Sequence, residues 1–353
     1  MFDVNKIVRK HILSLKSYSS ARDEYTGTEG VFLDANENPY GSAGGGDFHR
    51  YPDPYQRKIK HALVGHTPAL GVEQIFIGNG SDEAIDLLFR AFCEPLEDNV
   101  LIMPPTYGMY QVSADINRVA IREVPLNKEF AIQTEKVLAA IDEHTRMIFV
   151  CSPNNPTGNT LSRESIETLL NNFDGLLVVD EAYIDFSPHQ SWVHSLKHYP
   201  NLVVLQTLSK SWGLAGLRLG MAFASKEVIG IVNKIKPPYN INEATQQLAL
   251  KALENREGMQ AMVADILQNK SDLEKALLAL PLVKSILPSD ANFIMAKFEE
   301  PKKIYTYLTR KLVIVRDRSS VLNCEGYLRI TVGSEEENKT LLKALKAYPE
   351  DGM

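Results

Sequence analysis

The sequence predicts an α/β fold, in which a mostly parallel sheet covered by helices on both faces is joined to a smaller α+β domain. Short, continuous apolar runs alternate with helical patterns from about residue 75 to residue 221. Such runs are typical of strands that are buried on both faces of a parallel sheet. After residue 238 a long helical stretch is followed by separated short strands, which indicates a second domain. A chain of 353 residues is long enough for two domains.

Apolar residues define the elements of the expected large domain, residues 31–238. Its central strands are expected at residues 75–77, 100–103, 147–150, 176–179 and 202–205. Apolar side chains three and four positions apart indicate helices over residues 85–92 and 166–170. A further apolar run at residues 217–221 is expected to form another buried strand.

The expected small domain covers residues 239–353 and has a different pattern. A helical stretch is predicted from about residue 242 to residue 280, with a break near Gly258. The remaining elements are expected to be strands near residues 292–295 and 327–330 and a terminal helix after Ser334.

Composition excludes several classes of partner. The chain carries 38 Lys and Arg against 44 Asp and Glu, a net charge of −6, which argues against nucleic acid or an anionic membrane. No apolar run approaches the roughly 20 residues that span a bilayer, and no signal peptide is expected.

Three separated cysteines favour a reducing cytoplasm. His194 and His198 lack a third ligand nearby, so no metal is expected.

The most informative segment surrounds Lys210. A lysine that forms a Schiff base with a cofactor must be close to hydroxyls and a cation if that cofactor carries a phosphate. Thr207 and Ser209 supply the hydroxyls, and Arg218 supplies the cation. For an isolated Ser-Lys pair, a surface loop would be the better interpretation. Apolar runs on both sides of this segment favour a site between two buried strands.

A second segment, residues 78–83, follows a predicted strand and opens a helix. The N–H groups of Gly80, Ser81 and Asp82 can bind a phosphate at the helix N-terminus. A dinucleotide-binding fingerprint is disfavoured, because Glu83 stands where the third glycine is needed. By itself this segment indicates an ordinary strand–turn–helix unit, but beside the Lys210 segment it predicts a phosphate site.

Asp180 ends the apolar run at residues 176–179. A buried carboxylate costs several kcal/mol unless it is paired, so a cationic partner is expected beside it. A metal-binding aspartate of the Walker-B kind is the alternative. It is disfavoured, because the chain has no Gly-Lys-Ser/Thr loop.

These segments, in this order, resemble the histidinol-phosphate aminotransferase family of fold-type I, class I/II enzymes, which use pyridoxal 5'-phosphate. The resemblance extends from about Tyr18 to Gly333. It implies that Lys210 binds the cofactor and then acts as general base and acid. It also implies that Asp180 pairs with the pyridine nitrogen and that Tyr183 bonds the ring oxygen.

The resemblance assigns further residues to the cofactor. Tyr107 in Pro-Pro-Thr-Tyr would stack on the ring, and Asn155 in Asn-Pro-Thr-Gly would face the ring oxygen, with Asn154 as a neighbour that does not. Tyr51 in Arg-Tyr-Pro-Asp would reach the cofactor phosphate of a neighbouring subunit, which implies a homodimer with shared sites. From the sequence alone, a packing tyrosine after a proline turn is as good an interpretation for Tyr107, the Asn155 segment is an ordinary turn signal, and a turn is the better interpretation for Tyr51.

The same resemblance implies a site for an anionic substrate. Arg316 and Arg329, at the ends of predicted strands, would bind the substrate anion, and Tyr18 and Asn36 would lie on the substrate side. The 13-residue spacing of the arginines favours L-histidinol phosphate, with 2-oxoglutarate as amino acceptor and glutamate as product. One departure is Ser17, where the family commonly has proline.

Other functions are compatible with parts of this pattern. Within the same fold, the alternatives are an aromatic-amino-acid aminotransferase and a threonine-phosphate decarboxylase. A non-catalytic regulatory domain is expected to need a fused DNA-binding segment, for which about 30 residues before the core leave no room. A nicotinamide dehydrogenase is disfavoured by the broken glycine fingerprint. The resemblance also implies that residues 1–30 join the small domain.

Overall fold

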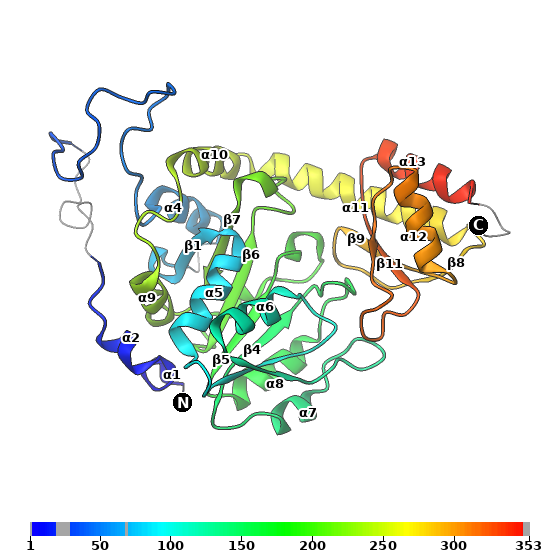
Figure 1. The fold of residues 1–353 in the computed structure, drawn as a ribbon, viewed down its shortest axis with the longest axis horizontal. Coiled ribbons are helices and arrows are strands. Elements are labelled where there is room, and N and C mark those ends of the chain that lie inside the picture. The colour runs from blue at the N-terminus through cyan, green and yellow to red at the C-terminus, as the bar shows by residue number, and fades with distance from the viewer. Residues whose placement is uncertain (1, 19–28, 68–69, 349–353) are drawn as a thin grey trace.

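The structure, a computed structural model, describes residues 2–18, 29–67 and 70–348. Figure 1 shows a large sheet flanked by helices and, beside it, a smaller sheet with its own helices, connected by the long helix α11. Among the described residues, no helix combines the length and the apolar character needed to cross a membrane.

The larger sheet has seven strands. They are β1 (Ile75–Asn79), β2 (Asn99–Ile102), β3 (Ala120–Glu123), β4 (Thr145–Cys151), β5 (Leu176–Asp180), β6 (Leu202–Thr207) and β7 (Leu219–Phe223). Their order is β1-β7-β6-β5-β4-β2-β3. Only β7 is antiparallel to its neighbours, so the predicted mostly parallel sheet is confirmed.

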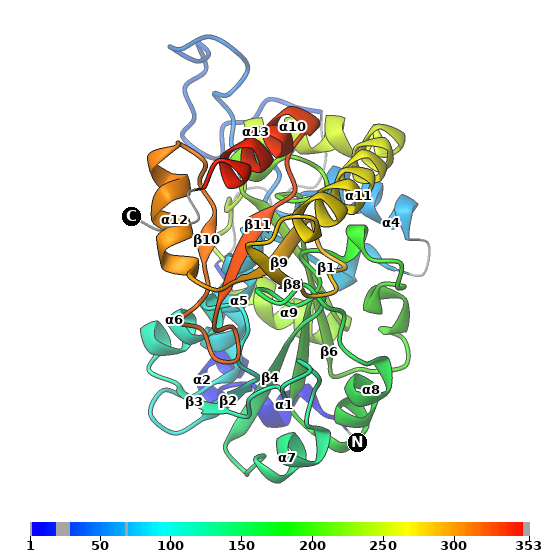
Figure 2. The same ribbon diagram turned by 90° about the vertical axis from the view of Figure 1, so that its right-hand side faces the viewer.

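Helices cover both faces of this sheet, as Figure 2 shows. They are α4 (Arg57–His66), α5 (Gly80–Phe92), α6 (Met109–Asn117), α7 (Thr134–Ala139), α8 (Arg163–Asn172) and α9 (Lys226–Ile235). Alternate residues of a strand point to opposite faces. In β5, Leu177 and Val179 therefore pack in one core and Leu176 and Val178 in the other, and all four are fully buried.

The smaller sheet is antiparallel, with the order β10-β11-β9-β8. Its strands are β8 (Val283–Ile286), β9 (Phe293–Phe298), β10 (Arg316–Asp317) and β11 (Tyr327–Thr331). It packs with α11 (Arg256–Leu278), α12 (Pro301–Arg310) and α13 (Glu335–Lys346) around a separate core that contains Ile294, Leu308 and Leu328. Short 3-10 helices lie at Val72–Gln74, Ile184–Phe186, Trp192–Ser195 and Ala215–Leu217.

The predicted helical stretch over residues 242–280 is two helices, α10 (Glu243–Leu253) and α11. The expected break near Gly258 was placed too late, because Gly258 lies within the first turn of α11. Asn255 precedes that helix, and its side-chain oxygen accepts a hydrogen bond of 3.2 Å from the Gly258 N–H. A polar cap of this kind starts a new helix where the sequence shows only continued helical periodicity.

The N-terminal helices α1 (Val4–Ile7) and α2 (Lys10–Ser14) lie against the large sheet's helices. Val4, Ile7 and Ile12 are buried in the same core as α5 and α9, and the Arg9 guanidinium contacts Glu94 at 3.1 Å. The expectation that residues 1–30 join the small domain is therefore wrong for this part, because its apolar side chains complete the core beside α5. Residues 1 and 19–28 lie outside the described residues.

Candidate active site

A cavity of about 600 Å³ lies between the carboxyl ends of β4, β5 and β6 and the smaller sheet. The register places Cys151 of β4 beside Asp180 of β5, and Asp180 beside Leu205 of β6, so residues at these strand ends converge. The predicted site residues that line the cavity are Gly80, Ser81, Asp82, Tyr107, Asn155, Asp180, Tyr183, Thr207, Ser209, Lys210, Arg218, Arg316 and Arg329.

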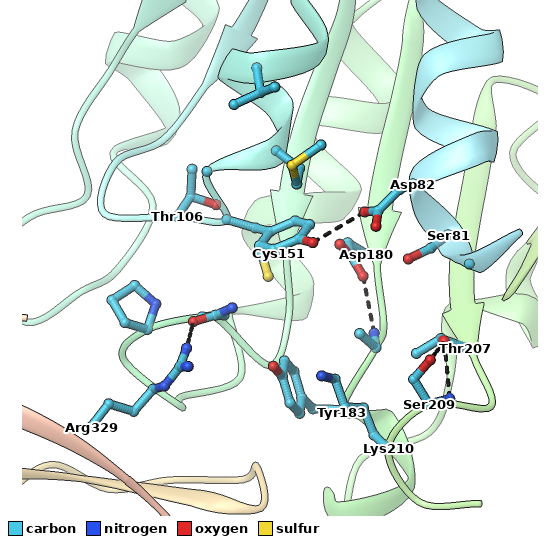
Figure 3. A pocket seen from close by; sticks show the side chains of 18 of the residues that line it. Ser81, Asp82, Thr106, Cys151, Asp180, Tyr183, Thr207, Ser209, Lys210 and Arg329 are labelled. Carbon is cyan, nitrogen blue, oxygen red and sulfur yellow. Dashed lines mark hydrogen bonds between the residues drawn. The ribbon is translucent and has the colours of Figure 1, made fainter. Parts of the chain in front are cut away.

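Lys210 lies in the turn that follows β6, and its amine faces the Tyr183 ring across 5.6 Å (Figure 3). Burial of the amine lowers the pKa of Lys210 below its ordinary value, and the nearby Arg329 guanidinium lowers it further. A lower pKa increases the fraction of neutral amine, which is the form that acts as a nucleophile or a base.

The loop that carries Lys210 is held by its neighbours. The Ser211 hydroxyl donates a hydrogen bond to the Asp185 carboxylate, and the Leu214 N–H donates to the Leu208 carbonyl at 3.0 Å. Gly213 has a φ of 66°, a conformation that favours glycine. These contacts fix the turn on both sides of Lys210.

Asp180 is 2 % exposed at the end of β5. The Tyr110 hydroxyl donates to its carboxylate at 2.8 Å, and the Ala182 N–H donates at 3.1 Å. Burial raises the pKa of Asp180 to about 6, although these two hydrogen bonds oppose the shift. No cationic side chain among the described residues forms an ion pair with Asp180, so the carboxylate can take a cationic ligand group.

Tyr110 was not predicted as a site residue from the sequence. It is fully buried, and its ring stacks on Phe149 at 4.6 Å while its hydroxyl bonds Asp180. Tyr110 lies in the first turn of α6, three residues after Tyr107, and the two rings meet edge to face with centroids 5.6 Å apart.

Groups suited to a phosphate gather around the first turn of α5. The Arg218 guanidinium is 3.7 Å from Asp82 and 3.4 Å from the Ser209 hydroxyl, which is itself 3.0 Å from the Thr207 hydroxyl. Gly80 has a φ of 73°, and a Cβ there would lie 2.8 Å from the Arg218 guanidinium. N–H groups, hydroxyls and a cation at a helix N-terminus together suit an anion.

Tyr107 and Asn155 both line the cavity. The Tyr107 hydroxyl donates to Asp82 at 3.1 Å. The Asn155 side-chain oxygen accepts a hydrogen bond from Arg329, which leaves its amide N–H groups for another acceptor. Asn154 instead donates to the Pro105 carbonyl at 2.9 Å and to Thr157, so its side chain is used within the protein.

The smaller sheet supplies the arginines. Arg316 of β10 is directly opposite Arg329 of β11, and the Arg329 guanidinium lies 5.2 Å from the Phe293 ring centroid. Burial lowers the pKa of Arg329, and so does its neighbour Arg318, which also lines the cavity. Arg318, which directly follows β10, was not predicted from the sequence, although it lies two residues after Arg316 in extended backbone and so shares its face.

Three predicted residues lie elsewhere in the single chain. Tyr51 and Asn36 line a separate groove, where the Tyr51 ring stacks on Tyr239 at 4.5 Å. Tyr18 is 75 % exposed and lines another hollow beside Tyr55. The structure therefore does not bring these three to the cavity that contains Lys210.

The chain matches the model of the family "Aminotransferase class I and II" over residues 24–345. It is 56 % identical to the histidinol-phosphate aminotransferase of Cytophaga hutchinsonii over 347 residues, which cover 98 % of this chain and 99 % of that protein. It is 50 % identical to the Flavobacterium johnsoniae protein of the same name, with 98 % of each chain covered.

Among solved structures, the fold is similar to that of histidinol-phosphate aminotransferase from Sinorhizobium meliloti in complex with pyridoxal-5'-phosphate. The TM-score is 0.77, with 22 % identity over 89 % of this chain and 90 % of the other. This likeness shows a shared fold, which is that of the fold-type I enzymes that the sequence predicted.

Proposed function

Because the chain belongs to the histidinol-phosphate aminotransferases, within the class I and II aminotransferases, we propose that it transfers the amino group of L-histidinol phosphate to 2-oxoglutarate. The products are imidazole acetol phosphate and glutamate, in the biosynthesis of histidine. The observation that carries this proposal is a single cavity in which Lys210 and Asp180 face arginines of the smaller sheet.

The cavity fits pyridoxal 5'-phosphate, the cofactor of this family. The Gly80 turn at the start of α5, with the Arg218 guanidinium beside it, suits a phosphate, and the buried Asp180 carboxylate suits a protonated ring nitrogen. Lys210 would bind the cofactor covalently, Tyr183 and Asn155 would bond the ring oxygen, and Tyr107 would pack on the ring. The groups proposed for the phosphate are Gly80, Ser81, Asp82, Thr207, Ser209 and Arg218. When bound, the cofactor supplies an electron sink for the electrons of the substrate Cα–H bond.

The protein residues then have separate tasks. Lys210 Nζ, once released, accepts the proton from the substrate Cα, which its lowered pKa favours. The Asp180 carboxylate, oriented by Tyr110 and the Ala182 N–H, keeps a positive charge on the group that it faces. Arg329 and Arg316 hold the substrate anion, a phosphate in one half-reaction and a carboxylate in the other. Tyr18 and Asn36 are proposed to contact the substrate only in the assembled enzyme.

Histidinol phosphate should be a better substrate than histidinol by about 100-fold or more in kcat/KM. Each charge-assisted hydrogen bond to a phosphate contributes roughly 1.5–3 kcal/mol, at about 1.4 kcal/mol per tenfold. The measurement is kcat/KM for histidinol phosphate, histidinol and phenylalanine on one preparation, with 2-oxoglutarate as acceptor. If phenylalanine equals or exceeds histidinol phosphate, the aromatic aminotransferase function replaces this one.

The enzyme is proposed to act as a homodimer with shared active sites. Residues 31–48 extend away from the two sheets (Figure 1), and Val31, Leu33 and Tyr40 on them are between 88 % and 96 % exposed. Apolar side chains with this exposure favour burial against a second copy. Tyr51 lies outside the cavity of its own chain, so it can serve the phosphate site of its partner.

Mixing two damaged chains should restore activity if Tyr51 acts across the dimer. A dimer of one Lys210→Ala chain and one Tyr51→Phe chain has one site with both changes and one site with neither. The activity of the refolded mixture should therefore exceed the average of the two parents. A mixture of wild-type and Lys210→Ala chains, which should give the simple average, is the control. Activity at the parental average for both mixtures contradicts the shared site.

The proposed domains are residues 31–238 and 239–353, with the cavity between them. The cytoplasm is the proposed location, and it is supported by three buried cysteines, Cys93, Cys151 and Cys324, that are all free thiols.

A further inference from the structure

Arg318 is a third arginine in the wall of the cavity. It directly follows β10, and its N–H donates to the Tyr327 carbonyl at 3.0 Å, which continues the ladder with β11. Arg316 and Arg318 are two residues apart and so point to the same face, and Arg329 lies across from Arg316. Three guanidinium groups therefore border one part of the cavity.

The Arg318 side chain has a buried Nε for which the described residues supply no acceptor. Its Nε is buried without a hydrogen-bond partner, and across residues 2–18, 29–67 and 70–348 the side chain forms no ion pair. The adjacent Asp317 accepts a hydrogen bond of 2.8 Å from the Ser319 N–H and points to the opposite face. Arg329 differs, since it donates to Asn155, and Arg316 differs, since it is exposed to water.

A buried Nε without a hydrogen-bond partner is unfavourable in this position. Burial lowers the pKa of Arg318, and repulsion from Arg316 lowers it further. A buried donor without a partner costs free energy, and that cost is removed when a ligand oxygen accepts from it. The arrangement therefore stabilises a bound anion more than it stabilises the free protein.

We propose that Arg318 selects the phosphate monoester over the carboxylate substrate in this site. This inference rests on the proposed function and assigns specificity within it. A carboxylate has two oxygens and one negative charge, which Arg316 and Arg329 can match. A phosphate monoester has three terminal oxygens and, above its second pKa of about 6, a charge near −2. A third guanidinium can match the third oxygen and the second charge.

The test replaces Arg318 with glutamine, which keeps a polar side chain but removes the charge. In the holoenzyme, kcat/KM for histidinol phosphate should fall about 10- to 100-fold, or about 1.4–2.8 kcal/mol at 1.4 kcal/mol per tenfold. The values for histidinol and for glutamate, which lack a phosphate, should change much less. Arg310→Gln is the matched control, because Arg310 is exposed on α12 and does not line the cavity.

The outcomes separate this inference from the proposed function. Equal losses for all three substrates, or no loss for histidinol phosphate, overturn the role of Arg318. A wild-type enzyme that shows no preference for histidinol phosphate over histidinol instead contradicts the proposed function. If Arg318→Gln does not fold, Arg318→Lys serves the same comparison. Lysine keeps the positive charge but cannot donate two parallel hydrogen bonds as a guanidinium does. A fall in kcat/KM for histidinol phosphate alone therefore supports the inference, and an equal fall for all three substrates overturns it.

Discussion

Replacing Lys210 with alanine should reduce transamination by roughly 10⁴-fold or more, since general acid–base catalysis alone contributes up to about that factor. The variant loses both the covalent bond to the cofactor and the base that takes the Cα proton. Binding of pyridoxal 5'-phosphate should persist, because Asp180 and the residues proposed to bind the cofactor phosphate, Gly80 and Arg218 among them, remain.

Two measurements check the role of Lys210. Single-turnover rates compare the wild type, Lys210→Ala and Lys226→Ala, in which an exposed lysine of α9 is removed as the control. Borohydride reduction of the wild-type holoenzyme, followed by peptide mapping, should place the cofactor on Lys210. A label on any other lysine contradicts the assignment.

Replacing Asp180 with asparagine should lower kcat by roughly 10²–10³-fold, the loss typical of removing one electrostatic group that acts in the transition state. Asparagine keeps the shape of Asp180 and can still accept from Tyr110 and the Ala182 N–H. It cannot keep a proton on a facing ring nitrogen, because it carries no charge. KM should change comparatively little, since the loss affects the transition state more than substrate binding.

Steady-state kinetics of Asp180→Asn and of Asp115→Asn test this expectation. Asp115 is an exposed carboxylate of α6 that bonds Gln111 and does not line the cavity, so its loss should leave kcat unchanged. A near-normal kcat for Asp180→Asn would show that another group holds the positive charge in place.

Much of the cavity could be predicted because its residues follow strands. Asp180 ends β5, Thr207 ends β6, and Gly80 follows β1. The carboxyl ends of parallel strands meet at one edge of a sheet, so motifs placed after successive apolar runs must lie close together. The same logic placed Lys210 and Arg218 on the loop between two buried strands.

Contacts between side chains from distant segments were harder to predict. Tyr110 bonds Asp180 across 70 positions of the chain, and the packing of α1 and α2 on α5 overturned an expectation about the N-terminus. Both contacts depend on which apolar surfaces remain uncovered once the sheet has formed. The local periodicity of the sequence does not indicate which surfaces these are.

The sequence by itself determined the alternation of strands and helices, because burial on both faces of a strand demands continuous apolar runs. It also determined the chemical groups around Lys210. Only the tertiary structure decided that Arg318 borders the cavity with an unpaired Nε, and that Tyr51, Asn36 and Tyr18 do not reach it within one chain. The physical reason is that the partners of a side chain, and its exposure to solvent, depend on which distant segments lie next to it. The packing of the two sheets decides this.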